Sequence, residues 1–249
     1  DSETVVVEHS TPLGDQIRTR MPSVTLIPLS SSTTPQQLEG DTAPTDSTVE
    51  VIRQAAERIL SGQADVVGLL PIRLPSTTGA NEDHAVSSSS YTFRPLLSDV
   101  YLPEGSLVFP GSFHPPHHGH FELVNASLAA TDCEVAWFEL SITNADKPSL
   151  AVEQVVDRLQ HFITLANNSA TNSRDRDLMP RQWGILLTDA PLFVQKVDLL
   201  YPLQVNRTFD AVLKATTVPP LHFVIGTDTL VRLLDPKYYD HSREKMLQI

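Results

Sequence analysis

The chain has 249 residues, a hydrophobic content of 41% and a formal net charge of −12 at pH 7. This length suits one large domain or two small ones. The acidic balance excludes general binding to nucleic acid, which needs a concentrated basic face. No apolar run approaches the roughly 18–20 residues that span a bilayer, so we expect no contact with the membrane interior.

Cysteine usage indicates a reducing compartment. With one cysteine, Cys133, the chain forms no internal disulfide. No basic segment followed by an apolar stretch occurs near Asp1, so no secretory signal is visible. We therefore expect a cytoplasmic protein, or one in another reducing compartment of the cell.

The first part of the chain, residues 1–104, is interrupted by two polar segments. Residues 30–48 and 74–90 are rich in Ser and Thr, which predicts loops or linkers. Between them, the capping-box pattern Ser47-x-x-Glu50 at the start of one apolar stripe predicts a helix. We expect this irregular N-terminal region to be unable to form a well-packed domain alone.

From residue 105 onward, apolar runs of strand length alternate with helical patterns. Helices are predicted at 119–130 and after Ser149, an N-cap candidate, and a polar loop is predicted at 167–181. This alternation is typical of a Rossmann-like α/β domain, a parallel sheet with flanking helices, here over residues 105–249. The strand candidates of the whole chain are residues 24–29, 66–70, 106–109, 134–140, 184–187 and 221–225, with Pro28 confining the first to a sheet edge.

The loop after residues 106–109 is the first candidate site, because ligands of parallel sheets bind beyond the carboxyl ends of strands. Residues 111–120 read GSFHPPHHGH, and four of the nine histidines fall within seven residues. Gly111 lets backbone N–H groups approach a phosphate, and Gly119 allows close contact where a helix begins. Imidazoles held there can donate hydrogen bonds to a triphosphate and stabilise charge on a pentavalent phosphorus.

Two other interpretations of the histidine cluster carry less weight. A zinc site is disfavoured because neither an H-E-x-x-H spacing nor a cysteine pair accompanies the histidines. Unrelated surface histidines would not explain why Gly and Pro fix the loop, nor why two histidines flank Gly119 at a helix start. We therefore expect no metal ion bound by protein side chains.

The ten residues 111–120 resemble the signature G-[ST]-F-x-P-x-H-x-G-H of the HxGH nucleotidyltransferase superfamily at every defined position. Pro115 makes the loop most similar to nicotinamide or nicotinate mononucleotide adenylyltransferases. Other segments are similar to eukaryotic cytidylyltransferase-like proteins that carry an amidase-like (CinA C-terminal-like) region upstream, to which residues 1–104 would contribute only the tail. These segments are residues 138–141 with 144–148, 188–191 with 193–202, and 223–229 with 236–239.

The resemblance implies roles for individual residues. His117 and His120 would be catalytic, contacting the triphosphate and stabilising the transition state. Lys147 would be a phosphate-side or acceptor-side cation, with a solvated loop lysine as the alternative. Gly226 and Asp228 would touch the ribose or base, and Asp228 is also an N-cap candidate. The remaining nucleotide-binding residues implied are Gly111, Ser112, Phe113 and Gly119.

The implied reaction joins ATP and a mononucleotide such as nicotinamide mononucleotide, as in NAD biosynthesis, and releases pyrophosphate. Mg²⁺ would be held mainly by the phosphates. Two alternatives stay open: a CTP-dependent cytidylyltransferase acting on a phosphorylated alcohol, and a non-catalytic nucleotide-binding or scaffold subunit.

One part of the superfamily pattern is missing. Its second phosphate-binding signature, I-S-x-[ST]-x-[IL]-R, does not follow Ile225, and the chain ends at Ile249, before the point where that signature is expected. The chain also begins without Met. We therefore expect a fragment that is incomplete at the C-terminus and has little or no activity alone.

Overall fold

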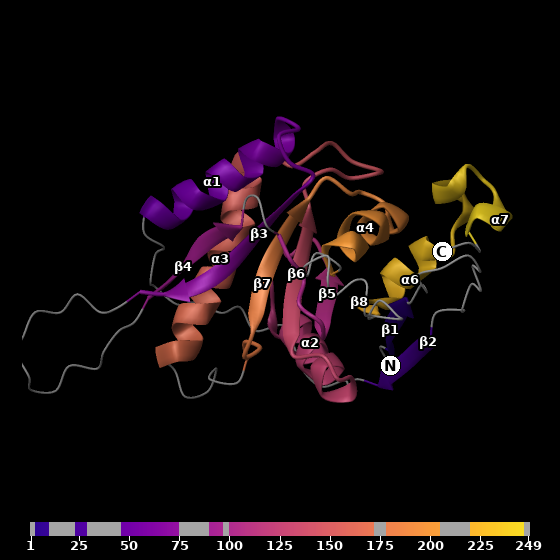
Figure 1. Cartoon of the computed structure of the whole chain (residues 1–249), viewed down its shortest axis with the longest axis horizontal. Helices are drawn as coiled ribbons and strands as arrows, with labels where there is room; N and C mark the ends of the chain where they lie inside the picture. The colour runs from indigo at the N-terminus through magenta and orange to yellow at the C-terminus, as the bar shows by residue number, and fades with distance from the viewer. Residues whose placement is uncertain are drawn as a thin grey trace, which may run out of the picture.

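Eight strands form a single sheet in the order β2-β1-β8-β5-β6-β7-β3-β4 (Figure 1). The computed structural model describes residues 3–9, 23–28, 46–74, 90–96, 100–171, 178–204 and 220–246, the first two ranges as strands only. The strands are β1 (Glu3–His9), β2 (Ser23–Pro28), β3 (Val66–Arg73), β4 (Tyr91–Leu96), β5 (Ser106–Pro110), β6 (Val135–Ser141), β7 (Trp183–Thr188) and β8 (Leu221–Ile225). The helices are α1 (Asp46–Leu60), α2 (His118–Ala130), α3 (Val152–Thr171), α4 (Phe193–Leu200), α6 (Thr227–Leu233) and α7 (Arg243–Met246), with 3₁₀ turns η1 (Tyr201–Gln204) and η2 (Pro236–Tyr239).

The centre of the sheet is parallel. Strands β8, β5, β6 and β7 pair side by side in the same direction, and helices connect them. All six residues of β7 are buried, as expected for a strand that is covered on both faces. The predicted parallel α/β core is therefore confirmed.

Antiparallel strands extend this core at both edges. The β3–β4 pair adds to β7, and the β1–β2 pair adds to β8. Pro28 ends β2 at one edge of the sheet, where proline removes no ladder hydrogen bond. Strands β3 and β4 belong to the same sheet as the parallel strands, and α1 packs on the same core. The sheet therefore includes strands from both sides of the predicted boundary at residue 104/105.

Alternating side chains build one hydrophobic core on each face. Helices α1, α2 and α3 cover the first face, where Ile52, Phe121 and Leu159 are fully buried. Helix α4, turn η1 and helix α6 lie on the second face, around the buried side chains of Leu200 and Phe223 (Figure 1).

Helix ends differ from the predictions where tertiary contacts override local signals. Helix α1 begins at Asp46, so Ser47 lies inside it, and α3 begins at Val152, so Ser149 is not its N-cap. Gln154 instead accepts the Ala151 backbone N–H at 2.9 Å.

Helix α3 also continues through residues 167–171, which were predicted to be a loop. Asn167 accepts the backbone N–H of Tyr91 at 2.7 Å, so a bond to β4 holds this part of the helix. Residues 172–177 of that predicted loop, and most of the predicted loops 30–48 and 74–90, lie outside the described residues. Within the part of the chain that is described, no helix is both long and apolar enough to cross a bilayer.

Gly184 is required by the packing of Trp137. The two residues are paired across β6 and β7, and a Cβ at Gly184 would lie 2.4 Å from the indole ring. We expect Gly184→Ala to lower the free energy of unfolding by about 1–3 kcal/mol through overpacking. Chemical denaturation of Gly184→Ala alone and in a Trp137→Leu background measures this. Equal costs in both backgrounds would contradict the steric explanation.

Candidate functional site

The histidine loop lies at the carboxyl end of the parallel strands. Residues 111–117 connect β5 to α2, and the backbone N–H of Gly111 donates to the carbonyl of Glu139 in β6 at 3.0 Å. Because β5 lies between β6 and β8, the loop is at the middle of the parallel core. This is the position at which the topology of such sheets places ligands.

Phe113 anchors the loop in the first-face core. Its backbone has a φ of 45°, a conformation that non-glycine residues rarely adopt, and its side chain is 1% exposed. The ring lies 5.3–5.7 Å from the rings of Phe109, Phe138 and Phe162. The side chain therefore points into the core, which leaves only the backbone of Phe113 for the predicted ligand contact.

Gly111 makes room for that ring. A Cβ at Gly111 would lie 2.6 Å from the Phe113 ring, so a larger residue would displace the anchor. Gly119 is similar, since a Cβ there would lie 3.3 Å from the imidazole of His117. Both glycines thus accommodate aromatic rings of the loop, a reason for glycine that is separate from the predicted approach of a phosphate.

His117 and His120 form a stacked pair at the start of α2. Their ring centroids are 3.7 Å apart, and the backbone N–H of His117 donates to Nδ1 of His120 at 3.1 Å. Burial, and then the neighbouring His117, lower the pKa of His120 to about 4. Burial, and then the neighbouring His118, lower the pKa of His117. His120 is therefore neutral at physiological pH.

The hydrogen bond from His117 decides which nitrogen of His120 carries the proton. A neutral imidazole has one N–H donor and one acceptor nitrogen. Because Nδ1 accepts the backbone N–H, the proton lies on Nε2. None of the described residues accepts a hydrogen bond from this Nε2, so its N–H is an unused donor among them.

Arg158 of α3 holds the other end of the loop. Its Nη1 donates to the carbonyl oxygen of Ser112 at 2.9 Å, while its buried Nε has no hydrogen-bond partner among the described residues. The neighbouring Asp157 lies 4.0 Å from Nδ1 of His114 in the same loop. The contact of Arg158 with Ser112 therefore fixes the loop backbone.

The other predicted site residues lie at the same edge of the sheet. Gly226 follows β8, which pairs in parallel with β5, and Lys147 is an exposed residue of the loop after β6. Gly226 is the N-cap of α6, so the predicted N-cap role of Asp228 is wrong, and its side chain lies outside the described part. The hydroxyl of Tyr238 donates to Asp146 at 2.7 Å, which joins the loop of Lys147 to η2.

A buried ion pair next to this edge was not predicted. Lys196 of α4 donates to Oε1 of Glu139 at 2.7 Å and to the carbonyl of Ala190 at 2.7 Å, and Thr188 also donates to Oε1. Oε2 of Glu139 is buried without a hydrogen-bond partner among the described residues. The one available signal was Glu139, a lone charged residue within the apolar stretch of β6.

The described residues contain no group of three or more His, Cys, Asp or Glu side chains able to hold a metal ion. No protein-family model, curated protein or solved structure matches the chain.

The state of His120 predicts a pH dependence of stability. In the unfolded chain His120 titrates near 6.5, so below that pH the unfolded state binds a proton that the folded state binds only near pH 4. The folded state therefore loses stability as the pH falls, by at most about 3 kcal/mol from this group. His120→Gln removes the titrating group, while the oxygen of Gln can still accept the hydrogen bond from the His117 backbone N–H.

We expect the stability difference between wild type and His120→Gln to shrink by about that amount between pH 7 and pH 4. Denaturant unfolding at several pH values measures it, and NMR titration should place the His120 midpoint near 4. A midpoint near 6.5 would contradict the burial argument.

Removing one partner of the buried ion pair is expected to be costly. Lys196→Met leaves the Glu139 carboxylate buried without its cation, which should lower the free energy of unfolding by about 3–5 kcal/mol. The double variant Lys196→Met/Glu139→Leu removes both charges and should recover part of that loss. Denaturant unfolding of the three proteins checks this, and equal stability of Lys196→Met and wild type would refute it.

Proposed function

We propose that this protein is a nucleotidyltransferase that binds a nucleoside triphosphate at residues 111–120 and transfers its nucleotidyl group to a phosphorylated acceptor. The observation that carries the proposal is the stacked pair of His117 and His120 at the carboxyl end of β5, with Nε2 of His120 available as a donor. Gly226, beyond the neighbouring strand β8, and the exposed Lys147 extend this edge.

The chemistry requires hydrogen-bond donors rather than a protein nucleophile. An oxygen of the acceptor phosphate attacks the α-phosphorus, a new P–O bond forms, and the bond to the β-phosphate breaks as pyrophosphate leaves with the electron pair. Negative charge builds on the α-phosphate oxygens and on the leaving oxygen. A neutral His120 that already carries its proton on Nε2 donates to this charge without a change of tautomer.

Rigidity of the loop supports the same proposal. The buried ring of Phe113 anchors the loop in the core, and Arg158 holds the carbonyl of Ser112 by a hydrogen bond. Donors that are already in place need no reorganisation when the transition state forms. Mg²⁺ bound to the phosphates would neutralise part of the triphosphate charge, since the described residues offer no cluster of ligands for it.

The choice of substrates rests on the resemblance of residues 111–120 to mononucleotide adenylyltransferases. On that basis the nucleotide is ATP and the acceptor is a pyridine mononucleotide such as nicotinamide mononucleotide. One of the segments that carry the resemblance is the loop after β7. In this loop the carbonyl of Ala190 accepts a hydrogen bond from the buried Lys196 at 2.7 Å.

Pyrophosphate release tests the proposal. With the full-length protein, ATP, Mg²⁺ and nicotinamide mononucleotide, we expect His120→Ala to lower the rate by about 10²- to 10³-fold, the usual cost of one lost transition-state donor. His161→Ala is the matched control, because His161 is exposed on α3 and, among the described residues, hydrogen-bonds only to the Asp157 carbonyl of its own helix. An undiminished rate in His120→Ala would show that the chemistry lies elsewhere.

Ligand binding is measured in parallel by thermal shift with ATP and with CTP. Stabilisation by CTP alone would support a cytidylyltransferase instead. Stabilisation without turnover on any mononucleotide or phosphorylated alcohol would support a non-catalytic nucleotide-binding subunit. The absence of both nucleotide binding and turnover would overturn the proposal.

A further inference from the structure

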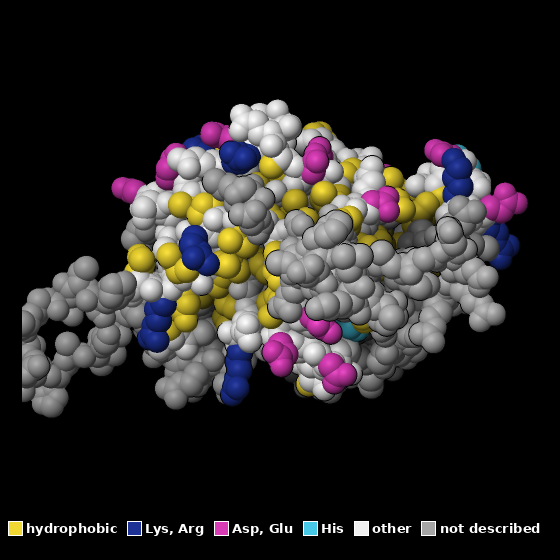
Figure 2. Space-filling view, in the orientation of Figure 1, with side chains coloured by type: hydrophobic (Ala, Val, Ile, Leu, Met, Phe, Trp, Pro, Cys, Tyr) yellow, Lys and Arg dark blue, Asp and Glu magenta, His cyan; other side chains and the backbone are white. Residues whose placement is uncertain are grey.

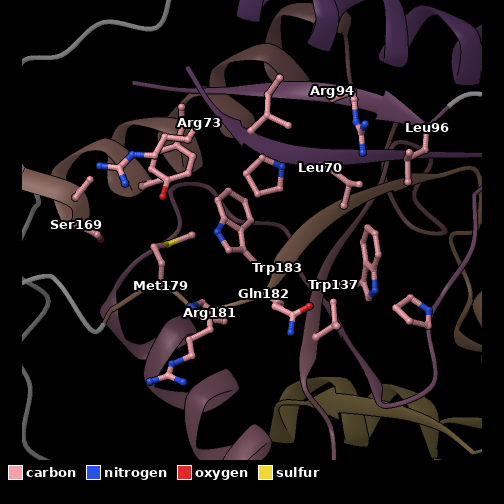
Figure 3. A pocket seen from close by; sticks show the side chains of 18 of the residues that line it. Leu70, Arg73, Arg94, Leu96, Trp137, Ser169, Met179, Arg181, Gln182 and Trp183 are labelled. Carbon is pink, nitrogen blue, oxygen red and sulfur yellow. The ribbon is translucent and has the colours of Figure 1, made fainter. Parts of the chain in front are cut away.

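A cavity among the described residues lies at the opposite end of the sheet from the histidine loop. It has a volume of about 820 Å³ and is lined by the starts of β6 and β7, by β3 and β4, and by the last turns of α3 (Figure 3). The register of β3 against β7 brings the end of β3 beside the start of β7. Cavities of this size commonly hold small organic ligands.

Aromatic side chains line this cavity. Tyr91 and Tyr101, both half-buried, present ring surface to it, and the two tryptophans, Trp137 and Trp183, lie beneath the lining at 2% and 7% exposure. The Trp137 ring is held over Gly184, and its Nε1 donates to Ser106 Oγ at 3.2 Å, so this surface is fixed. Such flat apolar surfaces favour ligands that contain a ring.

The charge of the lining has one sign. Arg73, Arg94 and Arg181 all contribute to it, and no Asp or Glu is among the lining residues that the structure describes, although the chain carries a net charge of −12. The three side chains are exposed and make no hydrogen bond or ion pair with any described residue. Dark blue Lys and Arg side chains lie among hydrophobic ones over β3 and β4 in Figure 2.

We propose that this cavity is a second ligand site, separate from the histidine loop, for a small organic anion that carries a flat ring. In Figure 3, Arg94 and Trp137 lie on one side of Trp183, and Arg73 and Arg181 lie on the other. A ring would lie against the aromatic side chains while a carboxylate, phosphate or sulfonate pairs with a guanidinium. Tyr91 is directly opposite Arg73, and Leu70 is opposite Arg94, so β3 and β4 supply both kinds of contact.

A pair of fluorescent probes separates the charge from the ring. 8-Anilinonaphthalene-1-sulfonate is an anion, and N-phenyl-1-naphthylamine has the same rings without the charge. We expect the anion to bind with one-to-one stoichiometry and to quench emission of the two tryptophans. The triple variant Arg73→Gln/Arg94→Gln/Arg181→Gln should lower the affinity for the anion about tenfold and the affinity for the neutral probe less than about twofold.

Two further variants keep the result interpretable. Arg232→Gln, an exposed arginine of α6, is the matched control and should leave both affinities unchanged. Ala170→Phe, at the exposed rim on α3, should weaken both probes by filling the cavity while the melting temperature stays near that of wild type. Equal affinity for both probes, or binding that survives both the triple variant and Ala170→Phe, would overturn the proposal.

Discussion

The aromatic ring of Phe113, buried beneath the loop that it belongs to, is the contact on which the candidate site depends. The ring packs on Phe109, Phe138 and Phe162 and lies 5.3 Å from the ring of His120. To reach this position, the backbone of Phe113 adopts a positive φ, and the space above the ring is left open by Gly111. The core of the first face therefore contacts the His120 ring directly.

Polar groups are buried at this edge in two different ways. The imidazole of His120 is half-buried, and this burial lowers its pKa, so the ring is neutral and no charge is desolvated. Glu139 and Lys196 instead pair with each other, with Thr188 and the carbonyl of Ala190 as further partners. The first arrangement leaves the Nε2 proton of His120 without an acceptor among the described residues, whereas the second holds β6, β7 and α4 together.

The two ends of the sheet have different chemistry. The carboxyl ends of the parallel strands carry the histidines, the glycines and the lysine of the β6 loop, as the topology of α/β sheets favours. At the amino ends, where β3 and β4 extend the sheet, a cavity is lined by aromatic rings and by arginines that pair with none of the described residues. The antiparallel pair therefore adds a second surface to the parallel core in addition to extending its edge.

Local patterns in the chain were enough to predict the parallel core, because buried strands and amphipathic helices have their own periodicities. They were also enough to predict the Gly- and His-rich loop, because its composition is concentrated in ten residues. Strand β4 and helix α4 were missed, since Arg94 and Lys196 interrupt their apolar patterns. The contacts of Arg158 with Ser112 and of Lys196 with Glu139 join residues 46 and 57 positions apart. These contacts follow from the strand order, and the pKa of His120 follows from burial, so only the packed tertiary structure decides them.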